Sequence, residues 1–369
     1  TNRIPFSTSL FFMKVLTKTL SIFCNVIDNF GDAGFCLRLA RDLSHLYKVE
    51  LLCDNLETLN KIKEKFEIND NLKISKWPQN NNDYHLTDII IEAFSCRLPK
   101  FCYKKIKEDG ALVIKLEYLT AEKFAEECHG LKSFSNGIES YFFFPGFTKK
   151  TGGVIIEKNL NDFNYQQNNL IQNKFLINIF SYETAPLKNF FYTLFKCKKN
   201  FEINVFEGLA QECLNKSFSK DLKVGDKIQI NNCNIKILKM VPQSKFDEIL
   251  FKADLNLVRG EDSIVRAMLS GKPFLWNIYP QSEDTHKEKL KALFARMKEH
   301  IQYLDIINKI EDLNLSYNHY GDAIENLDLI EFYPSWLQIS KIWATHLKSL
   351  GSLTDNLNKF IEDKLEEKS

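Results

Sequence analysis

The chain has 369 residues, of which 44% are hydrophobic and 26% charged, and its formal net charge is +1. A chain of this length exceeds what one hydrophobic core usually holds, so we expect two domains of an ordinary soluble protein. The near-neutral charge gives no indication of binding to nucleic acid or to an anionic membrane.

The cysteines and histidines indicate no disulfide framework and no zinc site. The nine cysteines include no CxxC pair, and an odd number of them favours reduced thiols and a cytoplasmic location. The seven histidines are dispersed, without HxxxH spacing. The apolar stretch around residues 10–12 is soon interrupted by Lys14 and Lys18, so it is too short to span a bilayer and makes a poor signal peptide.

Short apolar strands and amphipathic helices alternate in the first half of the chain. Within one predicted helix, Cys36, Leu39, Ala40 and Leu43 fall at spacings of three and four and form one apolar stripe. Such alternation predicts a mainly parallel sheet with helices on both faces. Strands are expected at 20–26, 49–53, 88–93 and 111–116, and helices near 35–46, 59–66 and 99–107.

The Asn- and Gln-rich stretch 159–173 resembles a linker, and the alternation restarts after it. We therefore expect domains at 19–160 and 174–335, and a helical tail at 336–369 that packs back on the first domain. The default site is the cleft between two facing Rossmann-like halves. Strands are expected at 175–180, 203–206, 235–240, 255–258 and 273–278, and helices at 186–195, 246–251, 261–269 and beyond 285.

The first candidate for chemistry is the sequence DNFGDAG, residues 28–34, at the carboxyl end of the first predicted strand. Asp28 and Asp32 are four residues apart, and Gly31 permits a tight bend, so both carboxylates can face the cleft. Equally, Asp32 can simply cap the helix that follows.

The second candidate is VRGEDSIVRA, residues 258–267, where a strand ends and a helix begins. Backbone N–H groups at the helix start, beside Arg259, are suited to a diphosphate. Because a carboxylate repels phosphate, Glu261 and Asp262 are better suited to sugar or ribose hydroxyls. Helix capping, with Ser263 included, remains the simpler alternative.

The third candidate is VPQSKFDEIL, residues 241–250, where Phe246 could stack on a base and Gln243 could read its edge. A core phenylalanine on an amphipathic helix is an alternative, as an ordinary strand-ending residue is for Tyr182. The chain has no GxxxxGK[ST] loop, no GxGxxG after its first strand and no GxSxG elbow. These absences disfavour a P-loop ATPase, an NAD-dependent dehydrogenase and an α/β-hydrolase.

Taken together, the motifs resemble the EarP family of protein-arginine rhamnosyltransferases that modify elongation factor P. The resemblance is carried, in family order, by IFCNVIDNFGDAGFCLRLARDL, IEAFSCRLP, LEYLTAEKFAEECHGL, FFFPGFTKKTGG, FSYE, VPQSKFDEIL and LNLVRGEDSIVRAMLSGKPFLWNIYPQ. It covers roughly residues 20–290.

The resemblance implies a GT-B fold, dTDP-β-L-rhamnose as donor, an arginine of elongation factor P as acceptor, and inversion at the anomeric carbon. It also implies no metal or other cofactor, and a role in rescuing ribosomes stalled at polyproline. Catalytic roles are then expected for Asp32, Asp28 and Glu261. The expected donor-binding residues are Asn29, Gly31, Tyr182, Gln243, Phe246, Arg259, Glu261, Asp262 and Ser263.

Two other classes of function stay open from the residues alone. One is a GT-B transferase or epimerase that uses another nucleotide sugar. The other is a non-catalytic nucleotide-binding partner of the translation machinery, against which the presence of both Asp28 and Asp32 beside a complete RGEDS block argues.

Overall fold

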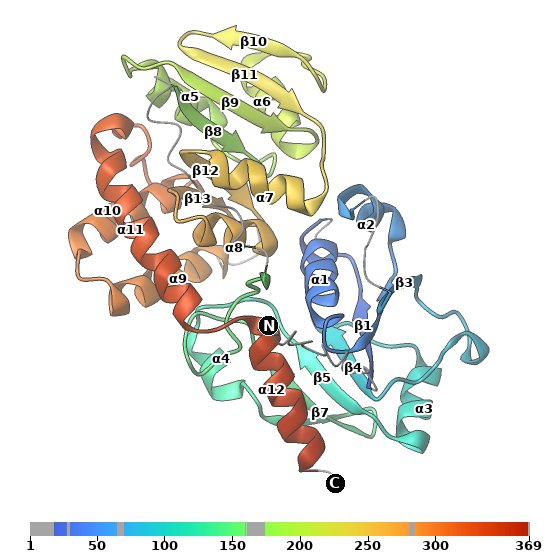
Figure 1. The fold of residues 1–369 in the computed structure, drawn as a ribbon. Coiled ribbons are helices and arrows are strands. Elements are labelled where there is room, and N and C mark those ends of the chain that lie inside the picture. Colours follow the sequence, from blue (N-terminus) through green and yellow to red (C-terminus); the bar gives the residue numbers. More distant parts are fainter. Residues whose placement is uncertain are drawn as a thin grey trace, which may run out of the picture.

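Two sheets covered by helices organise the chain, as Figure 1 shows. The computed structural model describes residues 18–27, 30–64, 70–158, 160, 174–279 and 285–367, apart from the side chains of residues 285 and 286. The first half contains β1(Thr19–Cys24), α1(Phe30–Leu43), β2(Lys48–Cys53), α2(Leu56–Ile62), β3(Leu72–Lys76), η1(Asn81–Asp83), β4(Ile89–Ala93), α3(Lys100–Asp109), β5(Leu112–Leu116), α4(Lys123–Cys128), β6(Lys132–Ser135) and β7(Ile138–Phe143).

The strands of the first sheet follow the order β3-β2-β1-β4-β5-β7-β6. The central strands β1 and β4 are almost wholly buried, as expected for parallel strands with helices on both faces. Strand order reverses between these two strands, so a crevice for a ligand is expected at their carboxyl ends. The β6–β7 hairpin was not predicted from the sequence; it turns at Asn136 and Gly137, both with positive φ.

The second half repeats this architecture, with strand order β10-β11-β9-β8-β12-β13. Apart from the buried Leu160, the expected linker 159–173 lies outside the described residues. The elements are β8(Phe175–Ile179), α5(Leu187–Phe195), β9(Phe201–Phe206), α6(Leu209–Phe218), β10(Lys227–Ile230), β11(Cys233–Leu238), α7(Gln243–Lys252), β12(Leu255–Arg259), α8(Glu261–Leu269), β13(Phe274–Asn277), α9(Thr285–His300), α10(Leu304–Ser316), α11(Leu329–Ser349) and α12(Leu353–Glu366).

Helix α1 begins earlier than the sequence analysis expected. It starts at Phe30 rather than near residue 35, so Gly31 and Asp32 belong to its first turn and do not form a tight bend before it. A carboxylate in the first turn is favoured by the helix dipole, and this local preference outweighs the two glycines of the segment. Asp32 is thereby fixed on a rigid element.

Two chain crossings join the halves and lie side by side. Val154, on the way out of the first half, forms a parallel bridge with Ser352, on the way back, and the Leu353 amide donates to the Val154 carbonyl at 2.8 Å. Gly152 is required here, because a Cβ would lie 2.3 Å from the Phe143 ring.

The helices expected as a C-terminal tail divide between the two halves. The expected boundary at residue 335 falls within α11, which is one continuous helix and contributes Trp336 and Trp343 to the core of the second half. Only α12 crosses to the first half, where Leu357 and Ile361 join the core beneath α1 and β5. Figure 1 shows α12 leaving α11 for the lower half.

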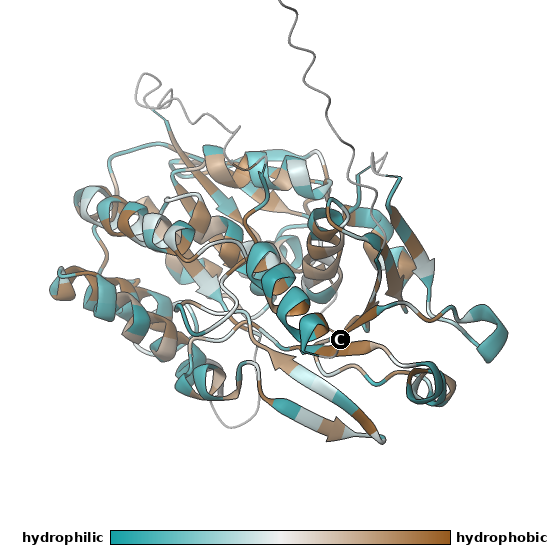
Figure 2. Cartoon of the chain, turned by 60° about the horizontal axis from the view of Figure 1, so that its bottom comes forward, coloured by the Kyte–Doolittle hydropathy of each residue, from teal (hydrophilic) through white to brown (hydrophobic). Residues whose placement is uncertain are grey.

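Hydrophobic residues concentrate in the strands and on the inward faces of the helices, as the colours of Figure 2 show. Among the described residues, no helix combines the length and the apolar character that a membrane span needs.

Candidate active site

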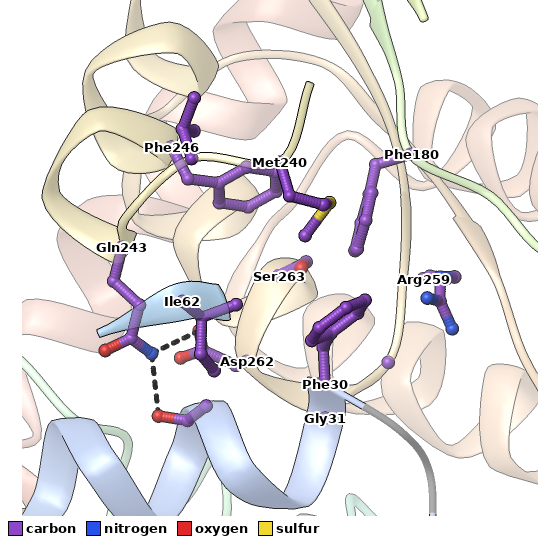
Figure 3. Close-up of a pocket in the computed structure, with 13 residues that line it drawn as sticks. Phe30, Gly31, Ile62, Phe180, Met240, Gln243, Phe246, Arg259, Asp262 and Ser263 are labelled. Carbon is purple, nitrogen blue, oxygen red and sulfur yellow. Dashed lines mark hydrogen bonds between the residues drawn. The ribbon is translucent and has the colours of Figure 1, made fainter. Parts of the chain in front are cut away.

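A pocket partly open to solvent lies where the two halves meet. Its walls are largely apolar, and Figure 3 shows Phe30 of α1 facing Met240 and Phe246 of the second half across it. The lining residues are Phe30, Gly31, Gly34, Ile62, Phe180, Met240, Val241, Gln243, Phe246, Arg259, Gly260, Asp262 and Ser263.

The start of helix α8 forms one end of this pocket. Gly260 precedes the helix with φ +67°, a conformation that favours glycine, and its carbonyl accepts from the Trp276 indole at 3.1 Å. Ser263 lines the pocket in the first turn. The first N–H groups of a helix have no partner within it, so this terminus can accept an anion.

Arg259 lies beside that terminus with its guanidinium held by two aromatic rings. Its central carbon is 4.7 Å from the ring centroid of Phe180 and 4.7 Å from that of Tyr182. Tyr182 is itself buried, and its amide donates to Asn277 Oδ1 at 2.9 Å. The planar cation is therefore oriented by stacking.

Phe246 belongs to the core, as one of the two alternatives for it expected, and it also lines the pocket. Its ring packs 5.2 Å from Phe180 and 5.2 Å from Phe206 in an aromatic cluster. A flat apolar surface of this kind suits a nucleobase.

In the first turn of α1, next in sequence to the lining residues Phe30 and Gly31, Asp32 is 2% exposed and is not itself among the lining residues. One of its carboxylate oxygens accepts from the Ile27 amide at 2.8 Å. Asp54 accepts from the Val26 amide at 2.9 Å, so carboxylates hold the loop after β1 from two directions. Asp28 and Asn29, which the sequence analysis singled out, lie outside the described residues.

Glu261 is engaged by both halves. One carboxylate oxygen accepts from the Leu119 amide of the first half at 2.8 Å, and the other pairs with Lys289 of α9 at 2.6 Å. Glu261 thus links the start of α8 to the segment after β5, a contact that its sequence did not suggest.

Gln243 and Asp262 also contact the first half. The Gln243 amide donates to the Gly34 carbonyl at 2.7 Å, and an added Cβ on Gly34 would lie 3.3 Å from that nitrogen. Asp262 accepts from Arg38 of α1 through both oxygens, at 2.8 and 3.1 Å. Figure 3 shows Gln243 reaching toward both α1 and Asp262.

Of the buried and half-buried charges behind these contacts, Asp262 alone was predicted from the sequence to belong to the site. We call them the arginine cluster: Arg38, Arg41, Arg266, Glu157, Asp247 and Asp262. The only signal was a charged residue, Arg38, within the apolar helix segment FCLRLA.

Burial and the neighbouring arginines have opposite effects on the pKa values of the three acids in the cluster. Burial opposes ionisation of Glu157 and Asp262, but the positive charges of Arg38 and Arg266 outweigh it and lower the pKa of both carboxyls. For Asp247, burial is the stronger effect and raises the pKa, although Arg38 opposes it.

Sequence comparison relates the chain to proteins of one name. The family profile described as Elongation-Factor P (EF-P) rhamnosyltransferase EarP matches residues 20–362. A protein-arginine rhamnosyltransferase of Pseudomonas putida is 34% identical over 310 residues, which cover 77% of this chain and 82% of that protein. One from Pseudomonas aeruginosa is 30% identical over 370 residues, covering 93% and 98%.

Structural comparison agrees on the fold. A solved structure described as the structural basis for EarP-mediated arginine glycosylation of translation elongation factor EF-P aligns with a TM-score of 0.66 and 24% identity, covering 94% of this chain and 99% of that one. A glycotransferase of kitacinnamycin aligns at 0.51 with 11% identity, covering 93% and 99%. With the two facing α/β halves, these similarities confirm the expected GT-B fold class.

Proposed function

This chain belongs to the EarP family of elongation factor P rhamnosyltransferases, and on that premise we propose that it moves L-rhamnose from dTDP-β-L-rhamnose to an arginine of elongation factor P. The transfer inverts the anomeric carbon and takes place in the cytoplasm. The observation that supports it most is the pocket between the halves, with a buried carboxylate, Asp32, on the helix that forms its first-half wall.

The donor nucleotide binds mainly to the second half. Its base stacks on Phe246 beside Phe180, and its diphosphate lies against Arg259 and the N–H groups at the start of α8. Arg259 is suited to this role because its guanidinium is oriented in advance by Phe180 and Tyr182. These groups take up the charge that develops on the leaving diphosphate, without a metal ion.

The acceptor arginine approaches from the first half, next to the loop after β1. A guanidinium has a pKa above about 12 and an ordinary aspartate one near about 4, so complete deprotonation before attack is steeply uphill. Asp32 instead orients the guanidinium, localises its positive charge and accepts the proton as the C–N bond forms. Asp28 assists in this orientation. Glu261 contributes from the donor side, held in place by Leu119 and Lys289.

The deciding experiment is intact-mass analysis of elongation factor P after incubation with the purified protein and dTDP-β-L-rhamnose. A mass gain of one deoxyhexose residue, mapped to an arginine by peptide fragmentation, is the expected result. Parallel reactions with UDP-glucose or without enzyme should leave the mass unchanged. An unchanged mass with dTDP-rhamnose would contradict the proposal, and a gain with UDP-glucose would favour the alternative transferase.

A further inference from the structure

Arg38 is the centre of the arginine cluster and uses every donor of its guanidinium. Nε donates to Asp262 at 2.8 Å, Nη1 to Glu157 and Asp247 at 2.7 Å each, and Nη2 to Asp247 and Asp262 at 3.1 Å each. A guanidinium has five N–H donors, and these five hydrogen bonds account for all of them. Such a site selects arginine over lysine, which has only three donors.

The three acidic partners come from three different parts of the chain. Asp247 lies on α7, Asp262 on α8 and Glu157 on the crossing between the halves, whereas Arg38 lies on α1 of the first half. The Arg38 side chain is 1% exposed. Separating the halves would leave these charges without their partners, so the cluster favours one relative arrangement of the four segments.

This arrangement connects the two sides of the proposed reaction. Arg38 follows Asp32 on the same helix by six residues, about 9 Å of a rigid rod. Its partner Asp262 belongs to the first turn of α8, next to Ser263 and two residues after Gly260, which line the pocket. Arg41 extends the link by donating to Gln243 at 3.3 Å.

We propose that Arg38 is a positioning residue for rhamnosyl transfer, which fixes α1 against α7 and α8 so that Asp32 is held at a set place relative to the donor. The proposal rests on the proposed function of the site. Arg38 acts through Asp32 and Asp262 and need not touch either substrate. Its loss should therefore reduce the rate of transfer more than the affinity for nucleotide.

The first test compares Arg38→Lys with Arg296→Lys. Arg296 is a matched control, because it is also buried and also joins the halves, through Ala121 and Glu126, but it lies on α9.

For Arg38→Lys we expect kcat at saturating substrates to fall at least about tenfold, since small misplacements of reacting groups are costly. The Kd of dTDP, measured by calorimetry, should change less than about threefold because the pocket groups remain. Arg296→Lys should keep kcat within about twofold. Equal losses in both variants, or a normal kcat in Arg38→Lys, would overturn the proposal.

The second test separates positioning from folding. The double variant Arg38→Met with Asp247→Leu removes one charge of each sign, so the cluster stays balanced, and such replacements often preserve stability. We expect a normal melting temperature, a reduced kcat, and a larger radius of gyration in solution scattering than for the unmodified chain. A normal kcat with a normal radius would refute the positioning role. Because scattering requires no turnover, it tests this role even if the unmodified chain fails to modify elongation factor P.

Discussion

At the scale of single residues, several side chains of this site make hydrogen bonds between the two halves. Gln243, Glu261 and Asp262 were expected to bind the donor, yet each also contacts a backbone group or a side chain of the first half. Their polar atoms are satisfied within the protein, as buried polar groups generally must be. A donor that binds them directly must exchange some of these hydrogen bonds for its own.

Asp32 is the residue whose substitution best separates chemistry from binding. Asp32→Asn keeps an oxygen that can accept from the Ile27 amide, so the loop should keep its shape. Transfer should fall by about 10²–10⁴, because the amide cannot take a proton. The measurement is the initial rate of the mass change of elongation factor P, alongside calorimetry with dTDP, which should show unchanged affinity.

Asp54→Asn provides the control for that prediction, because Asp54, directly after β2, supports the same loop through the Val26 amide. It should retain most of the transfer rate. If Asp32→Asn turned over like the unmodified chain, Asp32 would have no role in the mechanism.

Arg259 offers a test of the donor side. Arg259→Lys keeps the positive charge but loses the planar group between Phe180 and Tyr182. We expect the Kd for dTDP to rise about tenfold, equivalent to roughly 1–2 kcal/mol of lost stacking and bidentate bonding. Calorimetry measures it, with Arg97→Lys at an exposed position as the control. An unchanged Kd would remove Arg259 from the diphosphate site.

Among the elements, α4 and α12 meet at a histidine whose protonation should affect stability. The Phe144 amide donates to His129 Nδ1 at 3.0 Å, so this nitrogen carries no proton, and the ring packs near Phe143 and Phe360 of α12. Burial lowers the pKa of His129 below its ordinary value. The unfolded chain therefore binds this proton more readily, and stability falls as pH drops below about 6.5.

His129→Asn should reduce this acid sensitivity, because the amide oxygen can still accept from Phe144 but does not titrate. The free energy of unfolding, measured in urea between pH 7.5 and 5.5, should decline less steeply in the variant. The decline should persist in part, since burial also lowers the pKa of His346. His85→Asn, at an exposed position, should follow the unmodified chain. A slope unchanged by His129→Asn would show that His129 is not responsible.

The elements themselves were largely predictable, because apolar runs of four to six residues and helical stripes are local signals. β1, β4 and β12 lie within a few residues of their expected ranges. The start of α1 was wrong because two glycines suggested a loop where an acidic first turn begins the helix. The break between α11 and α12 was missed because both helices are amphipathic, and nothing local shows which half each will cover.

Residues of the site could be predicted from the sequence only where the residue type and a local motif together indicate a binding role. Arg259 and Ser263 were identified from a strand–helix junction, and the structure brings both to the pocket. Arg38 and Glu157 are 119 residues apart in the chain, and their ion pair depends on how the halves meet. Sequence periodicity contains no information about such a contact. The roles assigned to Asp32, Glu261 and the donor-binding residues stay predictions.

At the scale of the whole molecule, Leu119, Ala121 and Phe147 of the first half pack into the core of the second, and α12 returns to the core of the first, so we expect the halves to unfold together. Trp77 reports on the first half, whereas Trp276, Trp336 and Trp343 lie in the second. Leu357→Ala in α12 empties a fully buried site beneath α1 and should cost about 2–5 kcal/mol.

Urea unfolding followed by fluorescence, in the full chain and in a Trp77→Phe background, measures this effect. The transition midpoint should move equally in both backgrounds. Lys359→Ala, at an exposed position of the same helix, should stay within about 0.5 kcal/mol of the unmodified chain. If Leu357→Ala shifted only the Trp77 signal, the halves would be separate folding units.

The paired crossings at Val154 and Ser352 have an evolutionary consequence. The chain leaves the first half and re-enters it at neighbouring points, so in chain order the second half lies between β7 and α12 of the first half. A domain whose two ends lie close together can be inserted into another domain at a single position of its surface. A lineage could therefore exchange the second half as one unit and keep the first, provided that the replacement supplies carboxylates that pair with Arg38 on α1.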